Sequence, residues 1–227
     1  MFVGHYAASL ALKAADQRVP LAPLFLGVQV LDIVSAAFVL IGIEHWRIVP
    51  GITAASPLAL DVPYTHGFFT SLGWSVLAYL VVRALPLPQR FPRRITALFV
   101  GLAVWSHWWL DLIVHRPDLP IYDHTLNVGL GLWYSRPGTW IAETGLLVAA
   151  LVYYLRTSTA RNAAGRFAMP AFVVLLVAVN TVNLYGPPPR SSNAVAISAE
   201  IFYFAAALIA LWLARFRGGG RALRGPR

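Results

Sequence analysis

Residues 167–185 read FAMPAFVVLLVAVNTVNLY, a stretch without a charged side chain that lies between Arg166 and the prolines at 187–189. Because a helix needs roughly 20 apolar residues to cross about 30 Å of hydrocarbon, this stretch predicts a transmembrane helix. The sequence therefore predicts an all-α, polytopic membrane protein with about six transmembrane helices. The other five stretches of this kind lie near Leu21–Ile43, His66–Leu85, Ile95–His115, Thr139–Leu155 and Ala194–Phe216.

The composition supports this fold class. Of the 227 residues, 58% are hydrophobic and 12% are charged, whereas a soluble domain carries about 25% charged residues. The net charge of +9 on so apolar a chain argues against a nucleic-acid-binding module. The chain has no cysteine, which excludes disulfides, thiolate metal sites and a cysteine nucleophile. No internal repeat is visible, so we expect residues 1–227 to form a single membrane domain.

The first twenty residues, MFVGHYAASLALKAADQRVP, contain an apolar stretch that is too short to span a bilayer. No basic residue precedes this stretch, so we do not expect a cleaved signal peptide. We predict a short, half-inserted helix that either lies at the membrane interface or re-enters the bundle.

The basic residues predict how the chain is oriented. With a cytoplasmic N-terminus, 14 Lys and Arg residues fall on the inner side and 4 on the outer side. This bias predicts a protein of the cytoplasmic (inner) membrane with both termini in the cytoplasm. Residues 215–227 are then a flexible basic tail attracted to anionic lipid. Most acidic residues and five of the six histidines fall in the outer half.

The sequence Ser106-His107-Trp-Trp-Leu-Asp111 carries the sharpest chemical signal. Residues four apart lie on the same face of a helix, so His107 and Asp111 can face one site. An imidazole nitrogen and a carboxylate are both good ligands for Zn²⁺ or a similar divalent ion. The alternative is a hydrogen bond between helices, which membrane bundles use for packing.

Two further polar residues lie in or beside apolar stretches. His66 opens the second predicted span, where it could join His107 and Asp111 or serve as an interfacial helix cap. Asp32 lies within the first predicted span, where a buried carboxylate must be protonated, hydrogen-bonded or bound to a metal. Glu143 starts the fourth predicted span, and we interpret it as complementing a helix N-terminus.

Together these residues resemble the membrane-bound predicted metal-dependent hydrolases of the LexA-regulated inner-membrane type. The resemblance covers about residues 1–116 and rests on an N-terminal His, an Asp in the first span, a Thr-His pair and a His-x₃-Asp motif. It implies one or two divalent ions, Zn²⁺ or Mn²⁺, and phosphoester substrates. The ligand set that it implies is His5, Asp32, His66, His107 and Asp111.

The chain departs from that family at three positions. Asp61 and Val62 stand where the family has His and Arg, and Gly67 stands where it has Ser. Asp61 can still bind a metal, but the missing arginine weakens the case for an anionic substrate.

We therefore expect a metal-dependent hydrolase in the outer half of the bundle that acts on a phosphoester or lipid-like substrate beside membrane lipids. Asp61 or Glu44 is the predicted general base, since both lie on the outer rim. One alternative is a small transporter that uses the same intramembrane His and Asp residues. Another is a non-catalytic assembly protein whose polar residues only hold helices together.

Overall fold

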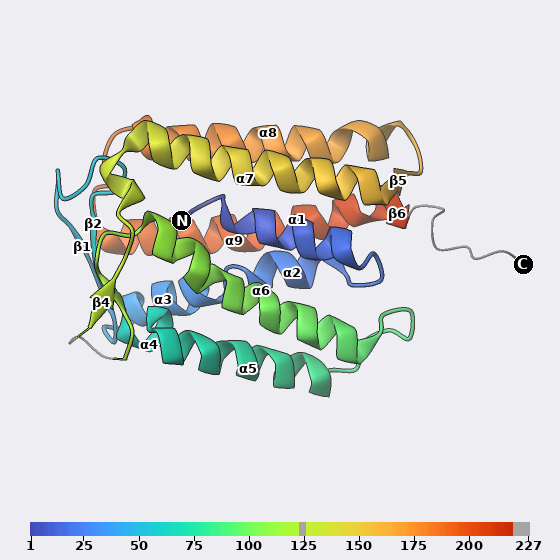
Figure 1. Ribbon diagram of the computed structural model, residues 1–227, viewed down its shortest axis with the longest axis horizontal. Helices are drawn as coiled ribbons and strands as arrows, with labels where there is room; N and C mark the ends of the chain where they lie inside the picture. The colour runs from blue at the N-terminus through green and yellow to red at the C-terminus, as the bar shows by residue number, and fades with distance from the viewer. Residues whose placement is uncertain (123–125, 220–227) are drawn as a thin grey trace, which may run out of the picture.

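The computed structural model describes residues 1–122 and 126–219, and the last eight residues of the predicted tail lie outside this range. Most of the described chain is helical, and the long helices run side by side (Figure 1). They are α5 (Phe68–Ala84), α6 (Arg93–Val114), α7 (Arg136–Thr157), α8 (Ala163–Tyr185) and α9 (Ser192–Leu213).

The fold is that of a polytopic helical membrane protein, as predicted. In the described residues, α6, α7, α8 and α9 are each long and apolar enough to cross a membrane. The fifth candidate is a bent pair, α2 (Leu21–Gly27) and α3 (Val30–Leu40), whose axes differ by 50°. The second predicted span is shorter than expected, because α5 has 17 residues and covers only about 25 Å.

The first predicted span differs from the expected continuous helix. It breaks between α2 and α3, where Gln29 has φ −113° and ψ 2°. Gly27 ends α2 close to α6, and a Cβ at this position would lie 3.1 Å from the Cβ of Ala103. Asp32 therefore lies in the first turn of α3, beside a helix N-terminus, and not in the middle of a span.

The N-terminal helix α1 (His5–Ala15) lies inside the bundle. It packs against α7, α2 and α6, and Figure 1 shows it between α7 and α2. His5, Tyr6, Ser9 and Leu10 are fully buried. Of the two placements considered for this segment, the structure has the one inside the bundle.

Short strands close the two ends of the bundle (Figure 1). At one end, β1 (His45–Ile48) pairs antiparallel with β2 (Leu58–Asp61), which leads into the single turn α4 (Pro63–His66). The 3₁₀ turn η1 (Leu132–Tyr134) precedes α7. The pair β3 (Leu119–Pro120) and β4 (Asn127–Val128) lies at the same end.

The other end corrects the prediction of a flexible tail from residue 215. The 3₁₀ turn η2 (Ala214–Phe216) continues into β6 (Arg217–Gly219), which pairs with β5 (Ser158–Ala160). The Arg217 guanidinium donates to the carbonyl oxygens of Gly165, Leu155 and Ser158 at 2.6–3.2 Å. These carbonyls hold the arginine in place, so the beginning of the predicted tail is ordered.

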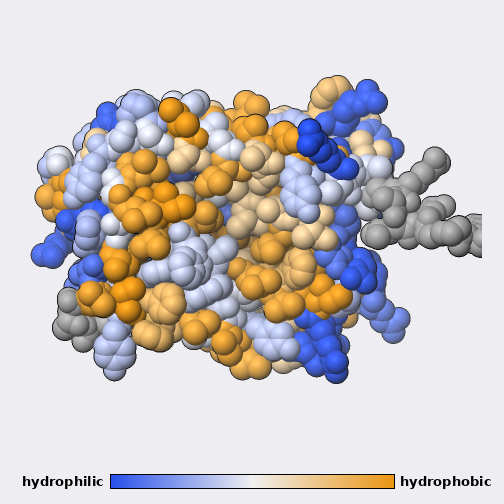
Figure 2. Space-filling view, viewed as in Figure 1, coloured by the Kyte–Doolittle hydropathy of each residue, from blue (hydrophilic) through white to orange (hydrophobic). Residues whose placement is uncertain are grey.

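Many of the large side chains exposed on the helices are apolar. Figure 2 shows hydrophobic residues over the central part of the visible face and hydrophilic residues gathered toward the two ends. Large side chains such as Leu80, Val174, Ile201 and Leu208 are at least half exposed. Exposed leucine and isoleucine along helices of this length are what a bilayer-facing surface requires.

Candidate metal centre

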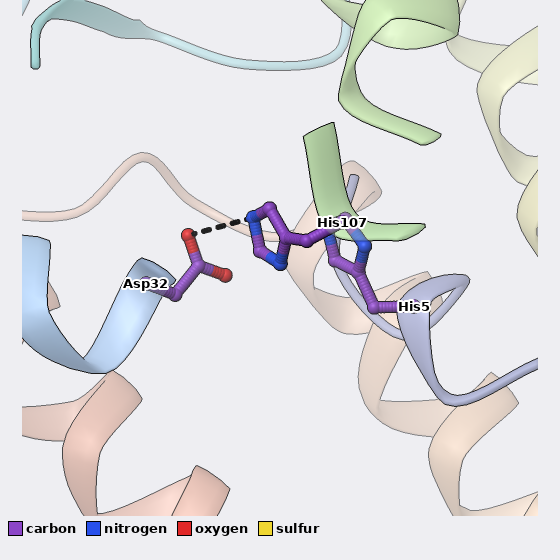
Figure 3. A group of neighbouring side chains, drawn as sticks. All are labelled: His5, Asp32 and His107. Atoms are coloured by element: carbon purple, nitrogen blue, oxygen red, sulfur yellow. Dashed lines mark ion pairs between the residues drawn. The ribbon is translucent and has the colours of Figure 1, made fainter. Parts of the chain in front are cut away.

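The five residues implied as ligands converge from four helices. His5 is the first residue of α1, Asp32 lies in the first turn of α3, and His66 is the last residue of α4. His107 and Asp111 lie one turn apart on α6. Apart from Asp32, which is partly buried, all are at most 3% exposed. Three of these elements contribute His5, Asp32 and His107, which Figure 3 shows facing one another.

The distances between the facing atoms are short and uniform. The Nε2 atoms of His5 and His107 each lie 3.1 Å from an oxygen of Asp111. His66 Nε2 lies 3.3 Å from Asp32 Oδ1 and 3.6 Å from Asp111 Oδ2, and His107 Nε2 lies 3.6 Å from Asp32 Oδ1. Ligands about 2.1 Å from a tetrahedral Zn²⁺ are about 3.4 Å apart, so the observed spacing suits this ion.

Two overlapping sets of three residues meet the distance requirement for a shared ion. They are His5, Asp32 and His107, and His66, His107 and Asp111, and within each set the ligand atoms lie within 4.8 Å of one another. The rings of His5 and His107 stack with centroids 3.7 Å apart, so their nitrogens lie side by side. His107 belongs to both sets and stands at the centre of the cluster.

Two of the three facing histidine nitrogens have no hydrogen-bond partner among the described residues, whereas His66 Nε2 is hydrogen-bonded to Asp32 Oδ1 at 3.3 Å. Nε2 of His5 and Nε2 of His107 are both buried and unpartnered, although carboxylate oxygens lie 3.1 Å away. A buried polar atom without a partner costs about 1–3 kcal/mol. The residues therefore fit a bound cation, which would accept these lone pairs together with those of the carboxylates.

The second nitrogen of His107 explains how its ring is oriented. Nδ1 lies 2.6 Å from the carbonyl oxygen of Val28, so Nδ1 carries the proton and donates it. Val28 lies at the break between α2 and α3, where a carbonyl is free of a helical partner. This bond leaves a lone pair on Nε2, which is the tautomer that a metal ligand needs.

A chain of hydrogen bonds orients His66 in the same way. Its Nδ1 lies 2.7 Å from the Thr65 hydroxyl oxygen, and that hydroxyl lies 2.9 and 3.0 Å from the carboxylate oxygens of Glu44. The Glu44 carboxylate also accepts from the backbone N–H groups of Tyr64 and Thr65 and from the Ser35 hydroxyl. Glu44 thus positions His66 through Thr65.

The structure does not bring the two predicted general bases into the cluster. The carboxylate of Glu44 is buried and surrounded by donors, which leaves no open face for a water molecule. Asp61 ends β2 opposite His45 in the antiparallel register, and neither carboxylate lines the cavity at the cluster. The prediction for Glu44 is therefore corrected to a positioning role. A position on the outer rim does not by itself identify a general base.

Three residues of the cluster's surroundings had not been assigned to it. His115 Nε2 lies 3.7 Å from Asp111 Oδ2, and its Nδ1 lies 3.0 Å from Asp118 Oδ1. The Tyr203 hydroxyl donates to Asp32 Oδ2 at 2.9 Å. His115 follows Asp111 by four residues, a spacing that could have placed it near the cluster. No pattern in the sequence connects Tyr203 of α9 with Asp32.

The third is Glu143, which complements a helix N-terminus as predicted, but that of α1, whose N-cap is Gly4, and not that of its own helix. It lies in the second turn of α7 and accepts from the backbone N–H groups of Phe2 and Gly4, both at 3.1 Å. These bonds fix the segment that leads into His5. The amino group of Met1 contacts the Asp111 carboxylate beside it.

Burial sets the charge state at the edge of the cluster. His115 follows the last residue of α6, and its burial lowers the pKa of its imidazole below the usual value because desolvation penalises the charged ring. A neutral imidazole with Nδ1–H held by Asp118 leaves Nε2 free to accept a proton.

A cavity of about 560 Å³ adjoins the cluster. Asp32, His66, Asp111 and His115 contribute to its wall. The rest of the wall is mostly apolar and comes from the N-terminal residues, α8, α9, η1 and the chain around β1 and β2, with Glu143 of α7 as a further acidic residue. The cluster can therefore be reached by a molecule with a large apolar part.

Comparison with known proteins gives one similarity of note. No family model matches the chain, and no solved structure matches it. The chain is similar to the Na(+)/H(+) antiporter NhaA 2 of Pseudomonas syringae pv. syringae (strain B728a), with 30% identity over 141 residues. The matched part covers 60% of this chain and 34% of the antiporter, so the chain spans about a third of that relative's length.

Proposed function

We propose that this protein is a membrane-embedded, metal-dependent hydrolase that acts on a phosphoester or lipid-like substrate. The observation that carries the proposal is the convergence of three imidazoles and two carboxylates at 3.1–3.6 Å, with the unpartnered Nε2 atoms of His5 and His107 facing the centre. Such a mixed nitrogen and oxygen set suits Zn²⁺ or Mn²⁺. The ligands are His5, Asp32, His66, His107 and Asp111.

The residues around the cluster supply the remaining parts of a hydrolytic site. When bound, a divalent ion supplies Lewis-acid activation of water and of the scissile bond. His115 lines the cavity beside the ligands and is held by Asp118 through Nδ1, so its Nε2 is placed to accept a proton from water. This histidine replaces Asp61 and Glu44 as the proposed general base.

The first test is metal content. We expect the purified protein to contain near-stoichiometric zinc or manganese by elemental analysis, and a His107→Ala/Asp111→Ala double variant to lose it. His45→Ala is the matched control, because His45 is an exposed histidine of β1 away from the cluster. A chelator-free preparation without metal would remove the proposal.

The second test is hydrolysis of phospholipids and of water-soluble phosphoesters by the metal-loaded protein. We expect turnover that the double variant lacks and that His45→Ala keeps. A His115→Gln variant that retains metal but loses activity would support the proton-accepting role. If the protein binds metal but hydrolyses none of these esters, it is a metal-binding protein and the hydrolase proposal is wrong.

A second candidate function is cation–proton exchange, which the similarity to an Na(+)/H(+) antiporter supports. The broken helix pair α2–α3 beside Asp32 also supports it, because broken helices form the ion sites of many transporters. The three imidazoles argue against Na⁺ as the ion, since hard cations prefer oxygen ligands.

The two candidates are separated by reconstituting the protein into liposomes with a pH-sensitive dye inside. An exchanger collapses an imposed pH gradient when Na⁺ is added, and an Asp32→Asn variant abolishes this response. A hydrolase leaves the gradient intact. A protein with neither metal nor exchange activity would be a non-catalytic assembly protein.

A further inference from the structure

Two neighbouring helices, α8 and α9, each contribute one stripe of residues to the wall of the cavity beside the cluster. On α9, Val195, Ser198, Ala199 and Phe202 line it, and their spacing of three and four places them on one face. On α8, a second stripe of Val179, Val182 and Asn183 lines it. The cavity therefore lies along the groove between α8 and α9.

This groove is open at the side of the bundle. Val182 lines the cavity and is nevertheless 69% exposed, and Asn183 and Ser198 are exposed as well. The two helices are consecutive in the chain but pack together only sparsely, whereas α5 and α6 pack along their lengths. Both α8 and α9 are long and apolar enough to span a membrane.

The chemistry of the wall changes along the cavity. Acidic and histidine side chains belong to the cluster and its margin, and the walls from α8 and α9 are mainly apolar. Among the described residues that line the cavity, none is Lys or Arg. A ligand that matches this wall has a polar group at one end and a hydrocarbon chain along the groove. The volume of the cavity, about 560 Å³, is within the roughly 300–1,000 Å³ of ordinary ligand pockets.

We propose that the groove between α8 and α9 admits the hydrocarbon chain of an amphiphile from the bilayer and holds its head group against the His/Asp cluster. This assignment rests on the proposed function for the reaction at the head group, and it names the substrate class and its route. The apolar residues of the stripe on α9 would then contact the hydrocarbon chain and favour substrates that carry one. A water-soluble ester without a chain would lack this contact.

The test uses a lysophosphatidylcholine that carries a photoreactive diazirine at the end of its chain. After irradiation with the purified protein, we expect adducts, located to single residues, on the cavity-lining side chains of α8 and α9: Val179, Val182, Asn183, Val195, Ala199 and Phe202. Glycerophosphocholine, which has the same head group and no chain, should not compete. Adducts confined to lipid-facing residues such as Ile201 would overturn the proposal, since they report contact with the probe's micelle alone.

Matched variants separate the groove from the lipid-facing surface. Ala199→Phe fills the cavity from α9, whereas Ile197→Phe places the same ring on a half-exposed residue outside it. We expect cavity adducts to fall at least tenfold in Ala199→Phe and to remain in Ile197→Phe. Equal yields in the two variants would contradict the proposal. If Ala199→Phe does not fold, Val182→Trp and its control Val174→Trp repeat the comparison on α8.

Metal content and ester hydrolysis are measured on the same preparations. Loss of groove adducts with metal retained would refute the chain-binding role alone. Groove adducts on a protein that binds no metal would refute the hydrolase and leave a chain-binding groove, so the two failures are distinguishable.

Discussion

At the residue scale, the three histidines of the cluster are oriented in different ways, two of them through the second ring nitrogen. Val28 fixes His107 through a backbone carbonyl, and Thr65 fixes His66 through a hydroxyl. Nδ1 of His5 has no partner among the described residues, and its ring is placed by stacking on His107. Backbone and side-chain contacts of this kind fix ligand orientation and tautomer.

The first prediction concerns Thr65, which connects Glu44 to His66. We expect Thr65→Val to weaken metal binding roughly 10–100-fold, because the hydroxyl that accepts from His66 Nδ1 is lost. Competition with a chelating dye measures the dissociation constant. Thr65→Ser keeps the hydroxyl and should restore affinity; failure of serine to do so would point to packing instead.

The second prediction concerns Tyr203, whose hydroxyl donates to Asp32 Oδ2. Tyr203→Phe removes this donor with little change of volume, and we expect metal binding to weaken by about tenfold, the lower end of the range for such contacts. Tyr153→Phe on α7 is the control, because Tyr153 is 46% exposed and faces away from the bundle. The same dissociation constant for both variants would mean that Tyr203 does not position Asp32.

At the element scale, the break between α2 and α3 creates the site. It places Asp32 at a helix N-terminus and frees the Val28 carbonyl for His107. It also allows α2 to approach α6 at Gly27, where a Cβ would meet the Ala103 side chain and the Val100 carbonyl. A continuous helix over residues 21–43 would provide neither arrangement.

The third prediction follows from this close approach. Gly27→Val should push α2 away from α6 and destabilise the fold by about 1–3 kcal/mol, the usual effect of overpacking. We expect metal affinity to fall as well, because Val28 moves with α2. Thermal unfolding in detergent measures the first effect. Gly73→Val in α5 is the control, since open space surrounds that position and it should keep its metal.

The fourth prediction concerns the closure of the bundle by β5 and β6. Arg217 donates to three carbonyl groups and to the Ser158 hydroxyl. Arg217→Ala leaves these acceptors without their charged donor, and we expect a loss of about 2–3 kcal/mol and a lower melting temperature. Arg215→Ala is the matched control, because Arg215 is exposed. Equal melting temperatures for the two variants would show that the side-chain hydrogen bonds of Arg217 do not stabilise the fold.

At the scale of the whole molecule, the two ends differ in charge. Loops that hold most of the basic residues gather at the end with β5 and β6, and the cluster lies toward the end with β1 and β2 (Figure 1). Positive loops remain in the cytoplasm as membrane proteins insert. The orientation with cytoplasmic termini therefore stays a prediction that the charge pattern supports.

The fifth prediction tests that orientation. The chain has no cysteine, so Gln89→Cys and Val49→Cys each introduce a single thiol, at opposite ends of the bundle. We expect a membrane-impermeant maleimide to label Val49→Cys in intact cells and Gln89→Cys only after lysis. The reverse pattern would invert the topology and place the cluster toward the cytoplasm.

Several features could be predicted from particular residues. Long uncharged stretches predicted the helices, because hydrocarbon requires apolar side chains and internally satisfied backbone groups. The pair His107 and Asp111 was visible because a spacing of four defines one helix face. His66 and Asp32 were visible as polar residues in or beside apolar stretches, and the motif resemblance added His5; the structure brings all three to the same cluster.

Other features were set by contacts between segments far apart in the chain. Tyr203 reaches Asp32 across 171 residues and Glu143 reaches Gly4 across 139, and no local pattern encodes such pairs. The helix break at Gln29 was missed because residues 27–29 contain neither proline nor a charged side chain, and Glu44 was misassigned because most of its donors come from other elements. The sequence by itself determined the membrane environment and the residue types available for chemistry, since both follow from local composition. Only the tertiary structure decided which of those residues meet, because burial of the short α1 and the bent α2–α3 pair against α6 places their polar side chains in one desolvated space.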